Sequence, residues 1–126
     1  MNTILWQRIE GGLVFAASML ALFSVWTLGS LPPWWLMLLV FFAPDLSFIG
    51  YLAGPKIGAA LYNIVHLYAF GVIMVVIAIS GVWVAPSLLV WGLLILGHAG
   101  FDRMFGYGLK EPSGFNQSHL GPIGQK

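Results

Sequence analysis

Four long apolar stretches, separated by short segments rich in glycine and proline, dominate the hydrophobic pattern of the chain. An α-helix needs about 20 predominantly apolar residues to cross the hydrocarbon core of a bilayer. Each of the four stretches meets that requirement. The pattern therefore predicts four transmembrane helices, at about Gly11–Leu28, Trp34–Ala53, Ile57–Ile79 and Ser87–Tyr107.

The segments between these stretches are short enough to be turns. Residues 29–33 read Gly-Ser-Leu-Pro-Pro, residues 54–56 read Gly-Pro-Lys, and a third break covers Gly81 to Pro86. Glycine just after a helix and proline near the start of the next are typical of such turns. Because short connections make neighbouring helices antiparallel, we expect an all-α membrane bundle over residues 1–109. Residues 110–126 are expected to form a cytoplasmic polar tail.

The composition supports a membrane protein and excludes several other classes. The chain of 126 residues is 60% hydrophobic and only 7% charged, whereas soluble domains carry about 25% charged residues. Its net charge of +1 leaves no broad basic surface for nucleic acid. The absence of cysteine excludes thiolate metal sites and disulfides. The expected partners are membrane lipids, with a homo-oligomer or a larger membrane complex as further candidates.

The positions of the cations predict the orientation. Four crossings place the start of the chain, the second turn and the end on one side, and all five cations fall there: Arg8, Lys56, Arg103, Lys110 and Lys126. The positive-inside rule assigns this side to the cytoplasm. Aromatic residues agree, with Trp26, Trp34, Trp35 and Trp83 at the outer interface and Trp6, Tyr51 and Tyr107 at the inner one. We expect a multi-pass protein of the inner membrane with both termini cytoplasmic.

Ionisable residues within the predicted spans indicate a polar layer. Asp45, His66 and His98 lie on three different helices, each roughly nine or ten residues from the cytoplasmic boundary, or about 14 Å deep. Asp102 follows His98 by four residues and shares its helix face. Charged groups at this depth are costly unless they are paired or functional. We therefore expect Asp45, His66, His98 and Asp102 to converge, with Asn63, Glu10 and Arg103 supporting them from the cytoplasmic edge.

Histidine and carboxylate ligands together favour zinc, iron or manganese, and bundle cores are a common place for such sites. A bound metal would activate water or support redox chemistry. Without a metal, the same groups could conduct protons or act as general acid and base, or form a structural hydrogen-bonded network. The residue pattern alone leaves these alternatives open.

Other candidate ligands are weaker. Haem ligation by His66 and His98 is compatible with their similar depth, but the adjacent carboxylates argue against it. His119 lies in the tail and is expected to be solvated. The methionines Met19, Met37, Met74 and Met104 are scattered, which favours packing over copper binding.

Glycines are spaced for close approach of helix backbones. Gly50, Gly54 and Gly58 recur every four residues, and Gly97 and Gly100 flank His98. Small residues at such intervals allow membrane helices to pack tightly. This spacing is compatible with close helix contacts at both places, and the turn after residue 53 is an alternative reason for the glycines there.

Several segments carry a family resemblance. They are the runs 43–58 (APDLSFIGYLAGPKIG), 62–66 (YNIVH), 98–103 (HAGFDR), 105–110 (FGYGLK) and 118–121 (SHLG). Together they resemble a family of small bacterial membrane proteins known only as a domain of unknown function. The resemblance covers nearly the whole chain and implies a four-helix membrane protein. It implies no activity, cofactor or catalytic residue.

Two function classes follow from the sequence. One is a metal-dependent membrane enzyme that acts on a lipid or a small hydrophobic molecule. The other is a non-catalytic accessory subunit of a larger membrane complex, in which the polar cluster is structural. A transporter is a third possibility, for which four short helices offer only a thin pathway.

Overall fold

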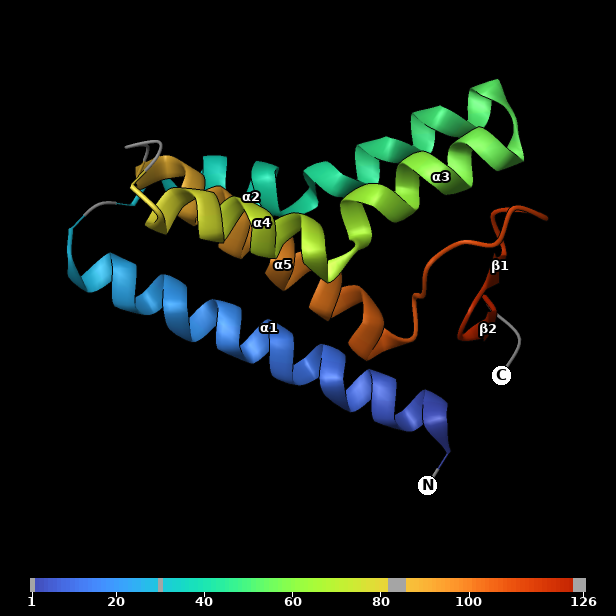
Figure 1. Cartoon of the computed structure of the whole chain (residues 1–126), viewed down its shortest axis with the longest axis horizontal. Helices are drawn as coiled ribbons and strands as arrows, with labels where there is room; N and C mark the ends of the chain where they lie inside the picture. Colours follow the sequence, from blue (N-terminus) through green and yellow to red (C-terminus); the bar gives the residue numbers. More distant parts are fainter. Residues whose placement is uncertain (1, 30, 82–85, 124–126) are drawn as a thin grey trace.

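The structure is a computed structural model that describes residues 2–29, 31–81 and 86–123 (Figure 1). Its helices are α1 (Thr3–Thr27), α2 (Trp34–Phe42), the 3₁₀ helix η1 (Ala43–Ala53), α3 (Pro55–His66), α4 (Tyr68–Ile79) and α5 (Pro86–Phe105). Two short strands follow, β1 (Gln117–Ser118) and β2 (Gly121–Pro122). The predicted turn at 81–86 lies partly outside the described residues. Three other positions named in the sequence analysis lie wholly outside them: Ser30, Trp83 and Lys126.

The predicted all-α membrane bundle is confirmed. Three helical segments are long and apolar enough to cross a membrane: Thr3–Thr27, Trp34–Ala53 and Pro86–Phe105. α3 and α4 pass the same test only as a pair, bent by 44° at the break between them, and such a pair is either one broken span or a re-entrant loop. Large apolar side chains such as Leu13, Leu20 and Ile73 are exposed along these helices. Lipid is the environment that accommodates such surfaces, so the chain is a multi-pass membrane protein.

Helix boundaries differ from the predicted ones in two informative places. α1 begins at Thr3 rather than near Gly11, because the Asn2 side chain accepts a hydrogen bond of 2.9 Å from Leu5 N–H and caps the helix. The predicted third helix is interrupted at Leu67, whose extended backbone (φ −69°, ψ 136°) separates α3 from α4. The first difference adds a polar extension to α1, and the second creates a helix end inside the bundle.

α5 is the central helix, and it packs against α1, α2 and α4. The contact with α1 is a backbone contact: a Cβ on Gly11 would lie 2.8 Å from the carbonyl oxygen of Gly100. Gly50 and Gly58 similarly join η1 to α3, where a Cβ on Gly50 would lie 3.3 Å from the Gly58 Cα. Gly54 instead fits the alternative that the turn needs a glycine, because it has open space around it and a φ of 110°. It terminates η1 in a conformation that favours glycine.

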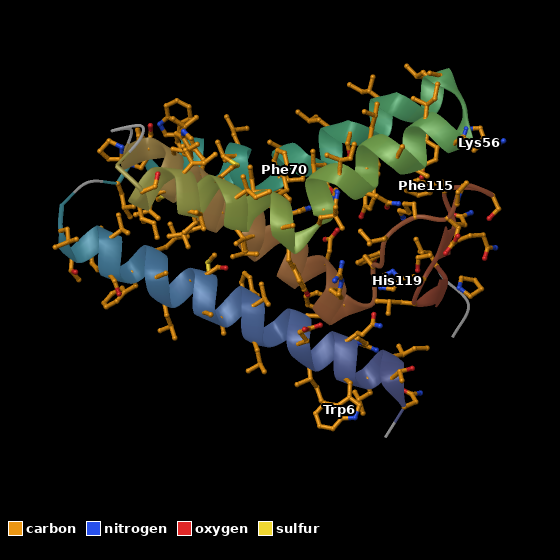
Figure 2. All side chains as sticks on the ribbon, in the orientation of Figure 1. Trp6, Lys56, Phe70, Phe115 and His119 are labelled. Atoms are coloured by element: carbon orange, nitrogen blue, oxygen red, sulfur yellow. The ribbon has the colours of Figure 1, made fainter. Side chains whose placement is uncertain are left out.

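The C-terminal segment, predicted only as a polar tail, contains short elements that fold against the bundle. β1 and β2 pair as an antiparallel hairpin, and Lys110 forms an isolated bridge with Ser118. The hairpin lies at the same end of the bundle as the start of α1 (Figure 1). Figure 2 shows His119 between this segment and α1, and Phe115 below α3. We call residues 106–123 the C-terminal cap.

The two halves of the bundle are filled differently. Away from the cap, the buried residues Leu22, Val90, Leu93 and Leu94 form an apolar core. Toward the cap, the buried side chains include His66 and His98. The polar layer expected from the sequence therefore lies on the cap side of the apolar core.

Candidate metal centre

Four ionisable side chains meet in the cap-side half of the bundle. Asp45 comes from η1, His66 from the end of α3, and His98 and Asp102 from α5. One potential ligand atom from each lies within 4.8 Å of every other. The convergence predicted from their depth is therefore correct.

Breaks in the helices place these side chains. Pro44 lacks a backbone N–H and precedes Asp45 at the point where α2 changes to the 3₁₀ winding of η1. His66 is the last residue of α3, because Leu67 leaves the helical conformation. His98 and Asp102 need no break, since residues four apart on α5 share one face.

The distances fit a tetrahedral metal site. The Nε2 atoms of His66 and His98 lie 3.2 Å apart. Asp45 Oδ1 lies 3.6 Å from His66 Nε2 and 3.4 Å from His98 Nε2. Asp102 Oδ2 lies 3.5 Å and 3.7 Å from the same two atoms. A regular tetrahedron with metal–ligand distances of about 2.0–2.1 Å has edges of about 3.3–3.4 Å, and these five separations are close to that value. The sixth separation, between the two carboxylate oxygens, is at most 4.8 Å.

The hydrogen bond at the outer nitrogen of His66 fixes its tautomer. His66 Nδ1 lies 2.8 Å from the carbonyl oxygen of Tyr62, and a carbonyl can only accept. Nδ1 therefore carries the proton, and in the neutral ring Nε2 directs a lone pair at the other three groups. Metal-binding histidines commonly donate their second N–H to a carbonyl in this way.

His98 is the most deeply buried of the four, with 1% of its surface exposed. The rings of Phe41 and Phe42 pack edge-on against it at centroid distances of 5.3 Å and 6.1 Å. Its Nε2 faces the lone pair of His66 and two carboxylate oxygens. Because those three atoms are acceptors, the contact requires either a hydrogen on His98 Nε2, which the neutral ring can carry, or a cation between the four groups.

Tyr62 is a site residue that the sequence analysis did not select. Its hydroxyl donates a hydrogen bond of 3.1 Å to Asp102 Oδ2. Its ring stacks on the His66 ring at 3.7 Å, with the two planes 11° apart. The signal was present in the spacing, because Tyr62 precedes His66 by four residues and so lies on the same helix face.

Three residues expected to support the cluster have other roles. Asn63 bonds to the cap, Arg103 lies over the Tyr68 ring at 4.3 Å, and Glu10 is exposed. Within the described ranges, no hydrogen bond or ion pair joins any of the three to the cluster. The physical reason is rotation, because consecutive helical residues differ in direction by about 100°. Asn63 and Arg103 each follow a site residue directly and therefore point elsewhere.

The cap is attached to the bundle at two points. Lys110 N–H donates to Asn63 Oδ1 at 2.6 Å, and Asn63 Nδ2 donates to the Lys110 carbonyl at 2.9 Å. His119, expected to be simply solvated, is exposed but bonded on both nitrogens. Its Nδ1 accepts from Leu109 N–H at 2.8 Å, and its Nε2 lies 2.9 Å from Gln7 Oε1. Burial lowers the pKa of His119 below its ordinary value of 6.5.

A cavity of about 210 Å³ connects the centre to the cap. Asp45, Tyr62 and Asp102 line its inner side, and Lys110 and Phe115 line the cap side. The side chains of Asp45 and Asp102 are 36% and 16% exposed, respectively. The two carboxylates are therefore the members of the cluster that a small molecule can reach.

A larger and apolar groove of about 670 Å³ lies between α1, α2 and α5. Phe41 and Phe42 line this groove and also pack against His98. The centre is thus separated from the groove by two aromatic rings.

These features define a class: a helical multi-pass membrane protein with a buried His–Asp cluster that could hold a metal. A family model described as "Domain of unknown function (DUF4260)" matches residues 4–123. The chain belongs to this family, which confirms the resemblance found in the sequence. No curated protein and no solved structure matches the chain.

Proposed function

We propose that the protein is a metal-dependent membrane enzyme that acts on a lipid or a small hydrophobic substrate. One divalent transition metal would lie between Asp45, His66, His98 and Asp102. The observation that carries the proposal is the convergence of four ligand atoms within 4.8 Å of one another, together with the His66 lone pair directed at the other three groups. Two nitrogen and two oxygen ligands suit zinc best, with iron and manganese as alternatives.

Charge balance supports a divalent ion. Two aspartates contribute two negative charges, and two neutral histidines contribute none. A divalent cation makes the centre neutral, which a low-dielectric environment strongly favours. A structural network would need protons in place of the metal.

The surroundings of the centre support a catalytic role. A metal in this position would supply Lewis-acid chemistry, polarising a substrate group or activating water. Asp45 and Asp102 face the cavity, so the centre is accessible on one side. Catalytic zinc sites keep one position for water or substrate, so the catalytic role requires that one cavity-facing carboxylate give up its position on the metal or that a fifth ligand be added.

The apolar groove supports a hydrophobic substrate. It is open to the membrane-facing surface of α1 and α2, and it ends against the phenylalanines that cover His98. A substrate with an apolar body could approach from the bilayer through this groove, and its reactive group would reach the centre only if Phe41 and Phe42 moved aside. The same groove also suits a helix of a partner protein, which is the basis for the alternative function of an accessory subunit.

The orientation remains a proposal, in which both chain ends face the cytoplasm from the inner membrane. Arg8 is near the start of α1, Lys56 near the start of α3 and Arg103 near the end of α5, and these helix ends lie toward the cap (Figure 1). Trp6 points outward near the start of α1 (Figure 2), as expected for an interfacial anchor.

Metal analysis of the purified full-length protein tests the proposal. We expect roughly one transition metal per chain after loading and dialysis, and loss of that metal in His66→Ala and His98→Ala. His119→Ala is the matched control, since this histidine lies outside the cluster, and it should retain the metal. A wild-type protein without stoichiometric metal, or single-histidine variants that retain it, would overturn the proposal.

A further inference from the structure

Lys110 is a buried cation beside the proposed metal centre. Only 4% of its surface is exposed, although it belongs to the cap. Its ammonium group lies over the rings of Phe115 and Tyr62, at 4.1 Å and 5.0 Å from their centroids. Within the described residues, no carboxylate lies within ion-pair distance of it. A buried lysine without a paired anion is costly, so its position requires an explanation.

The backbone of Lys110 is held firmly. Both its N–H and its carbonyl bond to the Asn63 side chain, at 2.6 Å and 2.9 Å. It also forms the bridge with Ser118 that ties the cap together. These contacts direct a cation into the cavity that Asp45 and Asp102 line from the other side.

The charges around the cavity require an anion. A divalent metal and two aspartates sum to zero, and Lys110, itself buried, then adds one positive charge at the cavity wall. A ligand with one negative charge would restore neutrality. Aromatic rings stabilise the ammonium group through cation–π interactions, but they do not balance its charge.

The size of the cavity limits what it can hold. Its volume of about 210 Å³ is below the roughly 300–1,000 Å³ of sites that enclose a drug-sized ligand. It has room for a head group but not for a lipid tail. The apolar part of a substrate would have to extend out of the cavity.

We propose that this cavity is an anion subsite in which Lys110 binds a phosphate or carboxylate group of the substrate. The inference rests on the proposed function, because without the metal the two aspartates would repel an anion. It narrows the substrate class to hydrophobic molecules that carry a small anionic group. Lys110 is a specificity residue in this scheme.

The test uses calorimetric titration of the metal-loaded full-length protein in detergent. Inorganic phosphate is the first probe, and a short-chain phosphatidic acid is the second. Comparing the two affinities distinguishes a site for a free anion from a site for a lipid head group. Lys110→Met should weaken phosphate binding at least about tenfold, the usual scale for loss of a charged contact. Lys110→Arg should largely preserve it. Lys56→Met is the matched control, because Lys56 lies exposed at the η1–α3 turn (Figure 2). The Lys56→Met variant should bind phosphate with the affinity of the wild type.

Metal content is measured on every sample, so that the two proposals fail separately. If Lys110→Met keeps its metal but loses phosphate binding, the centre is intact and the anion subsite is supported. If the metal-loaded wild type does not bind either probe, or Lys110→Met binds as well as wild type, the subsite is refuted while the metal centre stands. If the wild type holds no metal, the proposed function fails, and the subsite in the form proposed fails with it.

Discussion

The hydrogen bond from Tyr62 to Asp102 offers a quantitative test of the centre. Tyr62→Phe removes the hydroxyl that donates to Asp102 Oδ2 at 3.1 Å, and it keeps the ring that stacks on His66. A hydrogen bond to a charged group contributes about 1.5–3 kcal/mol. If the bond helps to hold the carboxylate in the ligand position, its loss should weaken metal binding by roughly 10- to 150-fold, at about 1.4 kcal/mol per factor of ten. Residues that orient metal ligands typically have effects of about 10–100-fold.

The assay is competition for zinc against a chromophoric chelator, at fixed pH and in detergent. Tyr107→Phe is the matched control, because Tyr107 lines the same cavity and, in the described part of the chain, its hydroxyl has no hydrogen bond to the four ligands. We expect Tyr107→Phe to bind zinc as wild type does. Equal affinities for Tyr62→Phe and wild type would refute the positioning role of Tyr62. An equal loss in both variants would show that the effect is not specific to this bond.

Three further predictions concern packing, pH and orientation. Gly11→Val should lower the thermal unfolding midpoint strongly, because its Cβ would lie 2.8 Å from a carbonyl oxygen of α5. Gly12→Val should lower the midpoint less, because its Cβ would meet only the flexible side chain of a methionine. Equal effects of the two substitutions would contradict the close contact between α1 and α5. Because the pKa of His119 is lowered below 6.5 in the docked cap, docking should be strongest above pH 6.5 and should weaken as the pH falls through the lowered pKa. The protection factor of the Leu109 amide, which is its exchange rate corrected for the intrinsic pH dependence, should therefore fall in acid, and an unchanged protection factor would refute this linkage. The chain has no cysteine, so a single Gln117→Cys substitution provides one labelling site. This cysteine should react with membrane-impermeant thiol reagents only from the cytoplasmic side, and labelling from the outside would contradict the proposed orientation.

Hydropathy and depth were sufficient to predict the spans and the cluster. A bilayer imposes a length on each apolar stretch, and helix geometry then converts residue number into depth. Asp45, His66 and His98 could be placed at one level on these grounds alone. The cost of an ionisable group in lipid made their convergence the natural expectation.

The break at Leu67 could not be predicted from the sequence. Leu67 is an apolar residue between a histidine and a tyrosine, and neither proline nor glycine marks the position. Its extended conformation is set by the packing of α3 and α4 against different neighbours, η1 and α5. A local pattern carries no information about such long-range contacts.

The folded cap was missed for a related reason. Its glycine, proline and polar residues are typical of a solvated tail. The contacts that order it join residues far apart in the chain, such as Asn63 with Lys110 and Gln7 with His119. The same contacts explain why Asn63, expected beside the metal ligands, instead holds the cap in place over the cavity.

X-ray absorption at the edge of the bound metal tests the central claim most directly. For the loaded wild-type protein, the account predicts nitrogen and oxygen neighbours at about 2.0–2.1 Å, with the outer-shell scattering of two imidazole rings. His66→Ala should leave at most one imidazole, or no bound metal. A wild-type protein that holds no metal, or a metal without imidazole ligands, would contradict the assignment of Asp45, His66, His98 and Asp102 as a metal centre.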